Sequence, residues 1–169
     1  MLPARSGSGK TTLVAALAAK GWRYFPDELA LIDPVTGKVL PFPQPMGIKT
    51  GSVSPLSRYY PGLAGLPSHR RIDECGVCFL APFFDTPLEM KKDGVEIAAL
   101  YFPVHLPKVK TERVRLSPLE APRRLAAVGS SPRPITDGDI ETLIYLADRL
   151  PCYLLYFDSL EMALEIISV

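Results

Sequence analysis

The sequence predicts an α/β fold in which a mixed sheet is flanked by helices. Segments with helical periodicity alternate with short apolar runs that have the composition of buried strands. A Gly/Ser-rich segment, residues 4–12, leads directly into the first predicted helix. The chain has 169 residues, which is enough for one core, so we expect a single domain over residues 1–169.

The first predicted helix covers Lys10–Lys20. It is rich in Ala and Leu, and Gly21 follows at the position favoured just past a helix end. Thr136 is a suitable cap for a later helix in which apolar residues recur at helical spacing. In all, we expect three more helices, at residues 118–128, 135–150 and 158–169.

Apolar and aromatic runs predict the strands. These runs lie at residues 22–25, 29–32, 76–84, 95–102, 113–116 and 152–157. Asp33–Gly37 has the composition of a turn, and Val39–Pro45 is proline-rich and extended. Residues 48–65 combine Gly, Ser, Pro and Tyr without a clear period, so no element is assigned there.

The charge balance argues against nucleic acid as a partner. The chain carries 19 basic and 18 acidic residues, a formal net charge of +1, whereas proteins that neutralise phosphates along a strand usually have a clear basic excess. No apolar stretch reaches the roughly 18–20 residues of a membrane helix, and no signal peptide is recognisable. We therefore expect no membrane partner and a cytoplasmic location.

The segment from Ala4 to Thr12 (ARSGSGKTT) carries the clearest chemistry. It matches the phosphate-loop pattern G-x-x-x-x-G-K-[ST] everywhere except at Ala4, which replaces the first glycine. Gly7 and Gly9 allow the backbone to curl so that its N–H groups face phosphate oxygens. Lys10 is expected to reach the terminal phosphates, and the Thr11 hydroxyl is a ligand for Mg²⁺. The predicted nucleotide-binding residues are Ser6, Gly7, Ser8, Gly9, Lys10, Thr11 and Thr12.

A hydrophobic strand normally leads into such a loop. Only Met1, Leu2 and Pro3 precede this one, so the sequence predicts a domain whose N-terminal strand before the loop is missing or incomplete.

Asp27 and Glu28 form an acidic pair at a break between two apolar runs. Adjacent carboxylates there can hold Mg²⁺, or one of them can accept the proton of an attacking hydroxyl. A solvated turn explains the same residues equally well, because acidic residues are common in turns. The residues alone leave both readings open.

The stretch SGSGKTTLVAALAAKGWRYFPDELALID, with VLPFPQPMGIKTGSV after it, resembles the HPr kinase/phosphorylase family. The likeness is strongest to its short members, the HPr-kinase-related serine kinases. In that family a phosphate loop and helix run into a G-x-[RY]-x-x-x-D-[DE] segment, as Gly21–Glu28 does here, and a proline-rich turn follows, as Pro41–Pro45 does here. The clear match covers about the first third of the chain.

The resemblance implies a P-loop nucleotide-binding domain of the phosphoenolpyruvate-carboxykinase-like type, with ATP and Mg²⁺ as cofactors. It implies catalytic roles for Lys10, Asp27 and Glu28, and a metal site at Thr11, Asp27 and Glu28. The acidic pair would hold the metal and act as general base toward a serine hydroxyl. The resemblance leaves open which of the two carboxylates is the base and whether the chain forms a homo-oligomer.

The sequence therefore predicts an ATP-dependent kinase that phosphorylates a hydroxyl, a serine of a small protein or peptide. The alternative is a nucleotide-binding sensor or partner module without phosphotransfer, which the missing first strand favours. Lys49, after the proline-rich turn, is a weaker candidate for a phosphate or substrate ligand, and His105 is interpreted as structural.

Overall fold

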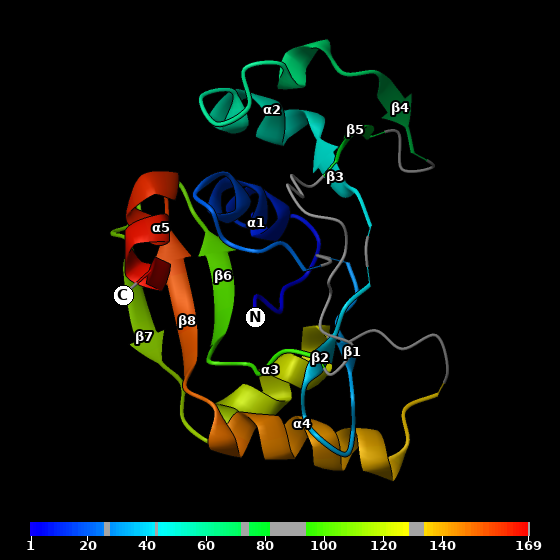
Figure 1. Cartoon of the computed structure of the whole chain (residues 1–169). Helices are drawn as coiled ribbons and strands as arrows, with labels where there is room; N and C mark the ends of the chain where they lie inside the picture. Colours follow the sequence, from blue (N-terminus) through cyan, green and yellow to red (C-terminus); the bar gives the residue numbers. More distant parts are fainter. Residues whose placement is uncertain (26–27, 43, 72–74, 82–93, 129–133, 169) are drawn as a thin grey trace.

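The computed structural model describes residues 1–25, 28–42, 44–71, 75–81, 94–128 and 134–168, and within them the chain is mixed α/β with five α-helices and three small sheets (Figure 1). The helices are α1 (Lys10–Ala19), α2 (Thr50–Leu56), α3 (Glu120–Val128), α4 (Asp137–Arg149) and α5 (Leu160–Ser168), with a short 3₁₀ turn, η1, at Leu63–Gly65. The strands are β1 (Leu31–Ile32), β2 (Val39–Leu40), β3 (Met46–Lys49), β4 (Ser68–Arg70), β5 (Gly76–Leu80), β6 (Leu100–His105), β7 (Glu112–Arg115) and β8 (Cys152–Phe157).

One sheet has the order β6–β8–β7, with β6 parallel and β7 antiparallel to β8. Successive side chains of β6 and β8 point to opposite faces of the sheet, and most of them are buried. Tyr101 and Leu155 face a core shared with α1 and α5, whereas Leu100 and Leu154 face a second core shared with α3 and α4. The sheet therefore packs against α1 and α5 on one face and against α3 and α4 on the other.

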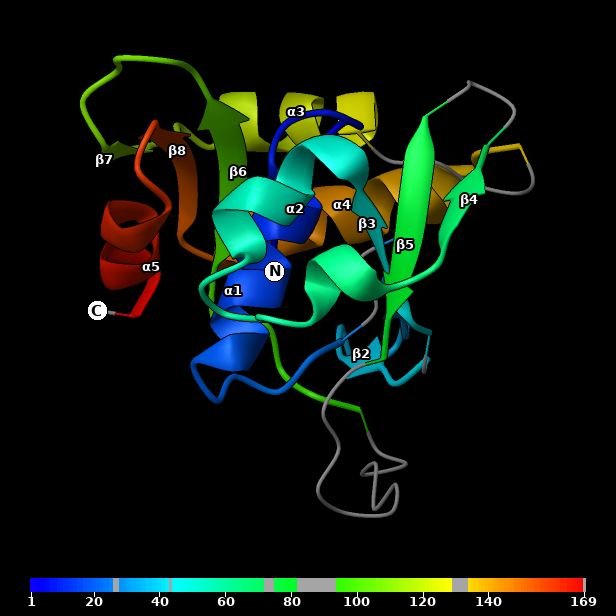
Figure 2. The ribbon, with the colours of Figure 1, turned by 90° about the horizontal axis from the view of Figure 1, so that it is seen from above.

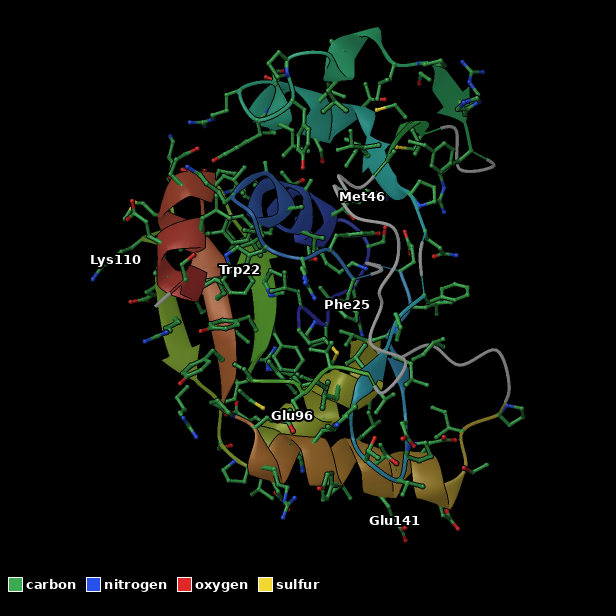
Figure 3. All side chains as sticks on the ribbon, viewed as in Figure 1. Trp22, Phe25, Met46, Glu96, Lys110 and Glu141 are labelled. Carbon is green, nitrogen blue, oxygen red and sulfur yellow. The ribbon has the colours of Figure 1, made fainter. Side chains whose placement is uncertain are left out.

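A second sheet has the order β3–β5–β4 and is antiparallel throughout. It lies on the other side of α1, so that α1 runs between the two sheets (Figures 1 and 2). Met46 of β3 is fully buried at this junction (Figure 3), together with Leu13 of α1 and Leu56 of α2. The composition of α1 suits this position, because its own small and apolar side chains allow both sheets to pack against it. By contrast, Lys110 and Glu141 lie at the outer margin of the molecule (Figure 3).

The N-terminal residue pairs with β6 at the edge of the β6–β8–β7 sheet. The Met1 amino group donates to the Ala99 carbonyl at 2.7 Å, and the Tyr101 N–H donates to the Met1 carbonyl at 3.0 Å. This pair of bonds is the pattern of a parallel bridge between Met1 and Leu100. Burial lowers the pKa of the Met1 amino group to about 6. The segment before the loop thus lies beside β6, on the edge opposite β8.

Prolines stop this ladder after one step. In a parallel ladder the next donors on this edge would be the N–H groups of residues 3 and 103, and both positions are proline. The contact with β8 is unaffected, because the alternate residues of β6 serve that side: Leu100 and Leu106 donate to carbonyls of Pro151 and Phe157. Pro103 is therefore tolerated inside a strand.

Several predicted elements are confirmed, and others differ. The first helix, the helices around 120–128 and 137–149, and the strand 152–157 occur as expected. Trp22–Phe25 is not a strand: the Trp22 N–H donates to the Leu17 carbonyl, which closes the end of α1, and its side chain is 48% exposed. The strand expected at 95–102 begins only at Leu100 and continues to His105. Residues 82–84 of another predicted strand lie outside the described residues.

Candidate phosphate-binding site

The loop before α1 curls through two glycines with left-handed backbone. Gly7 has φ +87° and Gly9 has φ +89°, values that side-chain-bearing residues rarely adopt. Between them, the Ser8 N–H donates to the Arg5 carbonyl at 3.3 Å and closes a turn. The two glycines of the sequence pattern are therefore required by the shape of the loop.

The loop rests on the carboxyl ends of β6 and β8. A Cβ added at Gly9 would lie 2.9 Å from Cζ of Phe157, the last residue of β8, and 3.4 Å from Cβ of His105, the last residue of β6. The rings of His105 and Phe157 are themselves 5.3 Å apart. Ligands of open α/β sheets bind at this edge, where parallel strands end.

The first amides of α1 lie outside its ladder of helical hydrogen bonds. Its first helical bond runs from the Leu13 N–H to the Gly9 carbonyl at 3.0 Å, so the amides of Lys10, Thr11 and Thr12 precede the helical ladder. Within the described structure no side chain caps this end, and the first turn contains no acidic residue. These amides and the helix dipole favour an anion at this position.

Ser8 adds an unsatisfied group to the same loop. Its Oγ is buried and has no hydrogen-bond partner among the described residues. A buried hydroxyl without a partner costs about 1–3 kcal/mol. A small shift of the loop that brings a water or a ligand oxygen within reach of Ser8 would remove this cost.

The β3–α2 corner reaches the loop from the second sheet. Lys49 ends β3, and its Nζ donates to Oγ of Ser6 at 2.8 Å. In the first turn of α2, Oγ of Ser52 accepts a hydrogen bond from Oγ1 of Thr12 at 2.8 Å. Two side chains of the predicted site are thus linked to a segment about forty residues further along the chain.

The acidic pair is described only in part. Glu28 is an exposed residue in a bend, and Asp27 lies outside the described residues. In the part of the chain that the structure describes, no group of three or more His, Cys, Asp or Glu side chains gathers that could hold a metal ion. The metal role of Thr11, Asp27 and Glu28 stays a prediction.

Two residues at the loop carry no functional prediction from the sequence. Ser52 lies in a stretch without a predicted element, and no motif marks it. His105, interpreted as structural, is the last residue of β6, a position that indicates the carboxyl edge of the sheet.

Comparison of the chain with protein-family models, with curated proteins and with solved structures found no match. Among the described residues, no helix is long and apolar enough to cross a membrane.

Proposed function

We propose that this chain is an ATP-dependent kinase of the HPr-kinase-like, P-loop type, which phosphorylates a serine hydroxyl of a small protein or peptide. The observation that carries the proposal is the loop of residues 4–12, with left-handed glycines at positions 7 and 9 and an uncapped helix directly after it. An uncapped helix start preceded by such a loop is suited to binding a polyphosphate.

The residues of the loop suit ATP with magnesium. The amides at the start of α1 and the Lys10 ammonium group offset phosphate charge, and Gly7 leaves the surface open, since a Cβ there would meet no atom within 4 Å. Thr11 and Glu28, with Asp27, supply the oxygen ligands that Mg²⁺ prefers. Magnesium, when bound, would neutralise charge on the terminal phosphates.

The reaction forms a bond from the acceptor hydroxyl oxygen to the γ-phosphorus. The bond from that phosphorus to the β,γ-bridging oxygen breaks, and ADP leaves with the electron pair. Asp27 or Glu28 takes the hydroxyl proton, which makes the oxygen a better nucleophile. Lys10 contributes by holding the terminal phosphates in line with the acceptor.

Two measurements on the full chain test the proposal. Titration calorimetry with MgATP should show binding that Lys10→Ala abolishes, while Lys20→Ala, at the exposed far end of α1, leaves it intact. Transfer of radiolabelled γ-phosphate to serine-containing peptides and small proteins should then occur with wild type and not with Lys10→Ala.

The outcomes separate the two functions. Binding of MgATP by folded protein without transfer to any acceptor would refute the kinase and support a nucleotide-binding sensor or partner module. Absence of binding to folded wild-type protein would refute both.

A further inference from the structure

Lys49 contacts the loop directly from the second sheet. Its Nζ lies 2.8 Å from Oγ of Ser6, across 43 positions of sequence, and the contact is exposed. Within the described residues Lys49 forms no ion pair. A full positive charge therefore lies at the loop, with a neutral hydroxyl as its acceptor.

Buried neighbours in β3 and a hydrogen bond in α2 fix the position of the Lys49 backbone beside the loop. Met46 and Ile48 of the same strand are fully buried against α1, so the intervening positions, Gly47 and Lys49, face away from that core. The hydrogen bond from Thr12 to Ser52 links α1 to the first turn of α2, directly after Lys49. The ammonium group is thus delivered to the loop by a strand and a helix that share a core with α1.

We propose that Lys49 is a second phosphate-binding cation, which exchanges the Ser6 hydroxyl for an oxygen of the polyphosphate bound in the loop. This inference rests on the proposed function, since it requires a nucleotide in that loop. An ammonium group has three N–H donors, and a phosphate oxygen is a stronger acceptor for them than a neutral hydroxyl.

The proposal also assigns a ligand class. A triphosphate with one Mg²⁺ still carries more negative charge than Lys10 offsets, and a second ammonium group from the opposite sheet supplies the difference. Lys49 therefore favours nucleoside di- and triphosphates over monophosphates and nucleosides. Binding through Lys49 would also tie the β3–β5–β4 sheet to the occupied loop.

The test compares Lys49→Met, which keeps the length of the side chain without its charge, with Lys49→Arg and with Lys20→Met as the matched control. Calorimetry with MgATP should show affinity about tenfold weaker for Lys49→Met, near wild type for Lys49→Arg and unchanged for Lys20→Met. Adenosine should bind all four proteins alike, because it has no phosphate. Magnesium tripolyphosphate should repeat the loss seen with MgATP.

Lys49→Gln separates a ligand role from a structural hydrogen bond. It keeps an N–H donor for Oγ of Ser6 and removes the ammonium charge, so it should bind MgATP as weakly as Lys49→Met does. Binding by Lys49→Gln as tight as that by wild type would show that only the hydrogen bond matters, and would overturn the proposal.

Two further outcomes are decisive. If Lys49→Met binds MgATP like wild type while Lys10→Ala does not bind, this inference fails and the proposed function stands. If folded wild-type protein binds neither MgATP nor tripolyphosphate, both fail. Should Lys49→Met not fold, the comparison of Lys49→Gln and Lys49→Arg with wild type decides, because Lys49→Arg keeps the charge and Lys49→Gln does not.

Discussion

Replacing Gly9 by alanine should destabilise the protein much more than the same replacement at Gly7. The two glycines have nearly the same φ, +89° and +87°, so we expect a similar local penalty for a Cβ at both, roughly 1–2 kcal/mol. They differ in what surrounds them. At Gly7 a Cβ would meet nothing within 4 Å, whereas at Gly9 it would lie 2.9 Å from Cζ of Phe157.

The clash at Gly9 adds a second cost. Phe157 is buried, with 3% of its surface exposed, and it belongs to the central strand of its sheet, so the ring cannot move aside freely. Overpacking of a buried site typically costs about 1–3 kcal/mol. We therefore expect Gly7→Ala to lower the free energy of unfolding by roughly 1–2 kcal/mol and Gly9→Ala by roughly 2–5 kcal/mol.

Urea unfolding followed by circular dichroism measures both values. The midpoint should fall in the order wild type, Gly7→Ala, Gly9→Ala, with an unchanged slope, since neither variant alters the surface exposed on unfolding. Equal midpoints for the two variants would refute the reasoning, because they would mean that the loop does not press against the end of β8.

Three further predictions concern the core and the N-terminus. The pKa of the Met1 amino group is lowered from 8.0 to about 6 in the folded chain, so the unfolded chain binds more protons between these two pH values. The free energy of unfolding should therefore rise by at most about 2–3 kcal/mol from pH 6 to pH 8. Acetylation of the amine should abolish this rise, as measured by urea titrations at several pH values. Tyr60→Phe removes a buried 2.7 Å hydrogen bond to the Ala15 carbonyl and should cost about 1 kcal/mol, measured in the same way; no loss would show that this bond contributes nothing. Leu155→Ala, at a fully buried position, should cost about 2–5 kcal/mol, whereas Leu119→Ala, at a 76% exposed one, should change the melting temperature little; similar losses would contradict the assignment of the core.

The elements with strong local signals could be predicted from the sequence. The helix that became α1 has a composition that favours helix throughout, and the strand Cys152–Phe157 is an apolar run bounded by Pro151 and Asp158. In α4 the Asp139 carboxylate accepts the Thr136 N–H at 2.8 Å, so the predicted cap is part of a reciprocal arrangement at that helix start. Such signals act within a few residues and are visible in the chain itself.

The β3–α2 corner could not be predicted, because tertiary packing forms it. Helix α2 has seven residues and contains Pro55, which local propensity disfavours, yet Leu56 at its end is fully buried. The bonds that bring Lys49 to Ser6 and Ser52 to Thr12 join residues about forty positions apart. Of the candidate site, the sequence indicates the loop as a motif and Lys49 as a candidate ligand, but not the contacts that bring Lys49 and Ser52 to the loop.

Pro3 and Pro103 end the strand pairing between the N-terminal segment and β6, and so separate the loop from the sheet. Residues with an N–H at positions 3 and 103 would allow strand pairing to continue toward Arg5, and fewer residues would remain for the loop. Because both prolines withhold a donor, the main chain is set free from β6 soon after Met1. The separation of the loop from β6 thus depends on two prolines that lie outside the predicted nucleotide-binding residues.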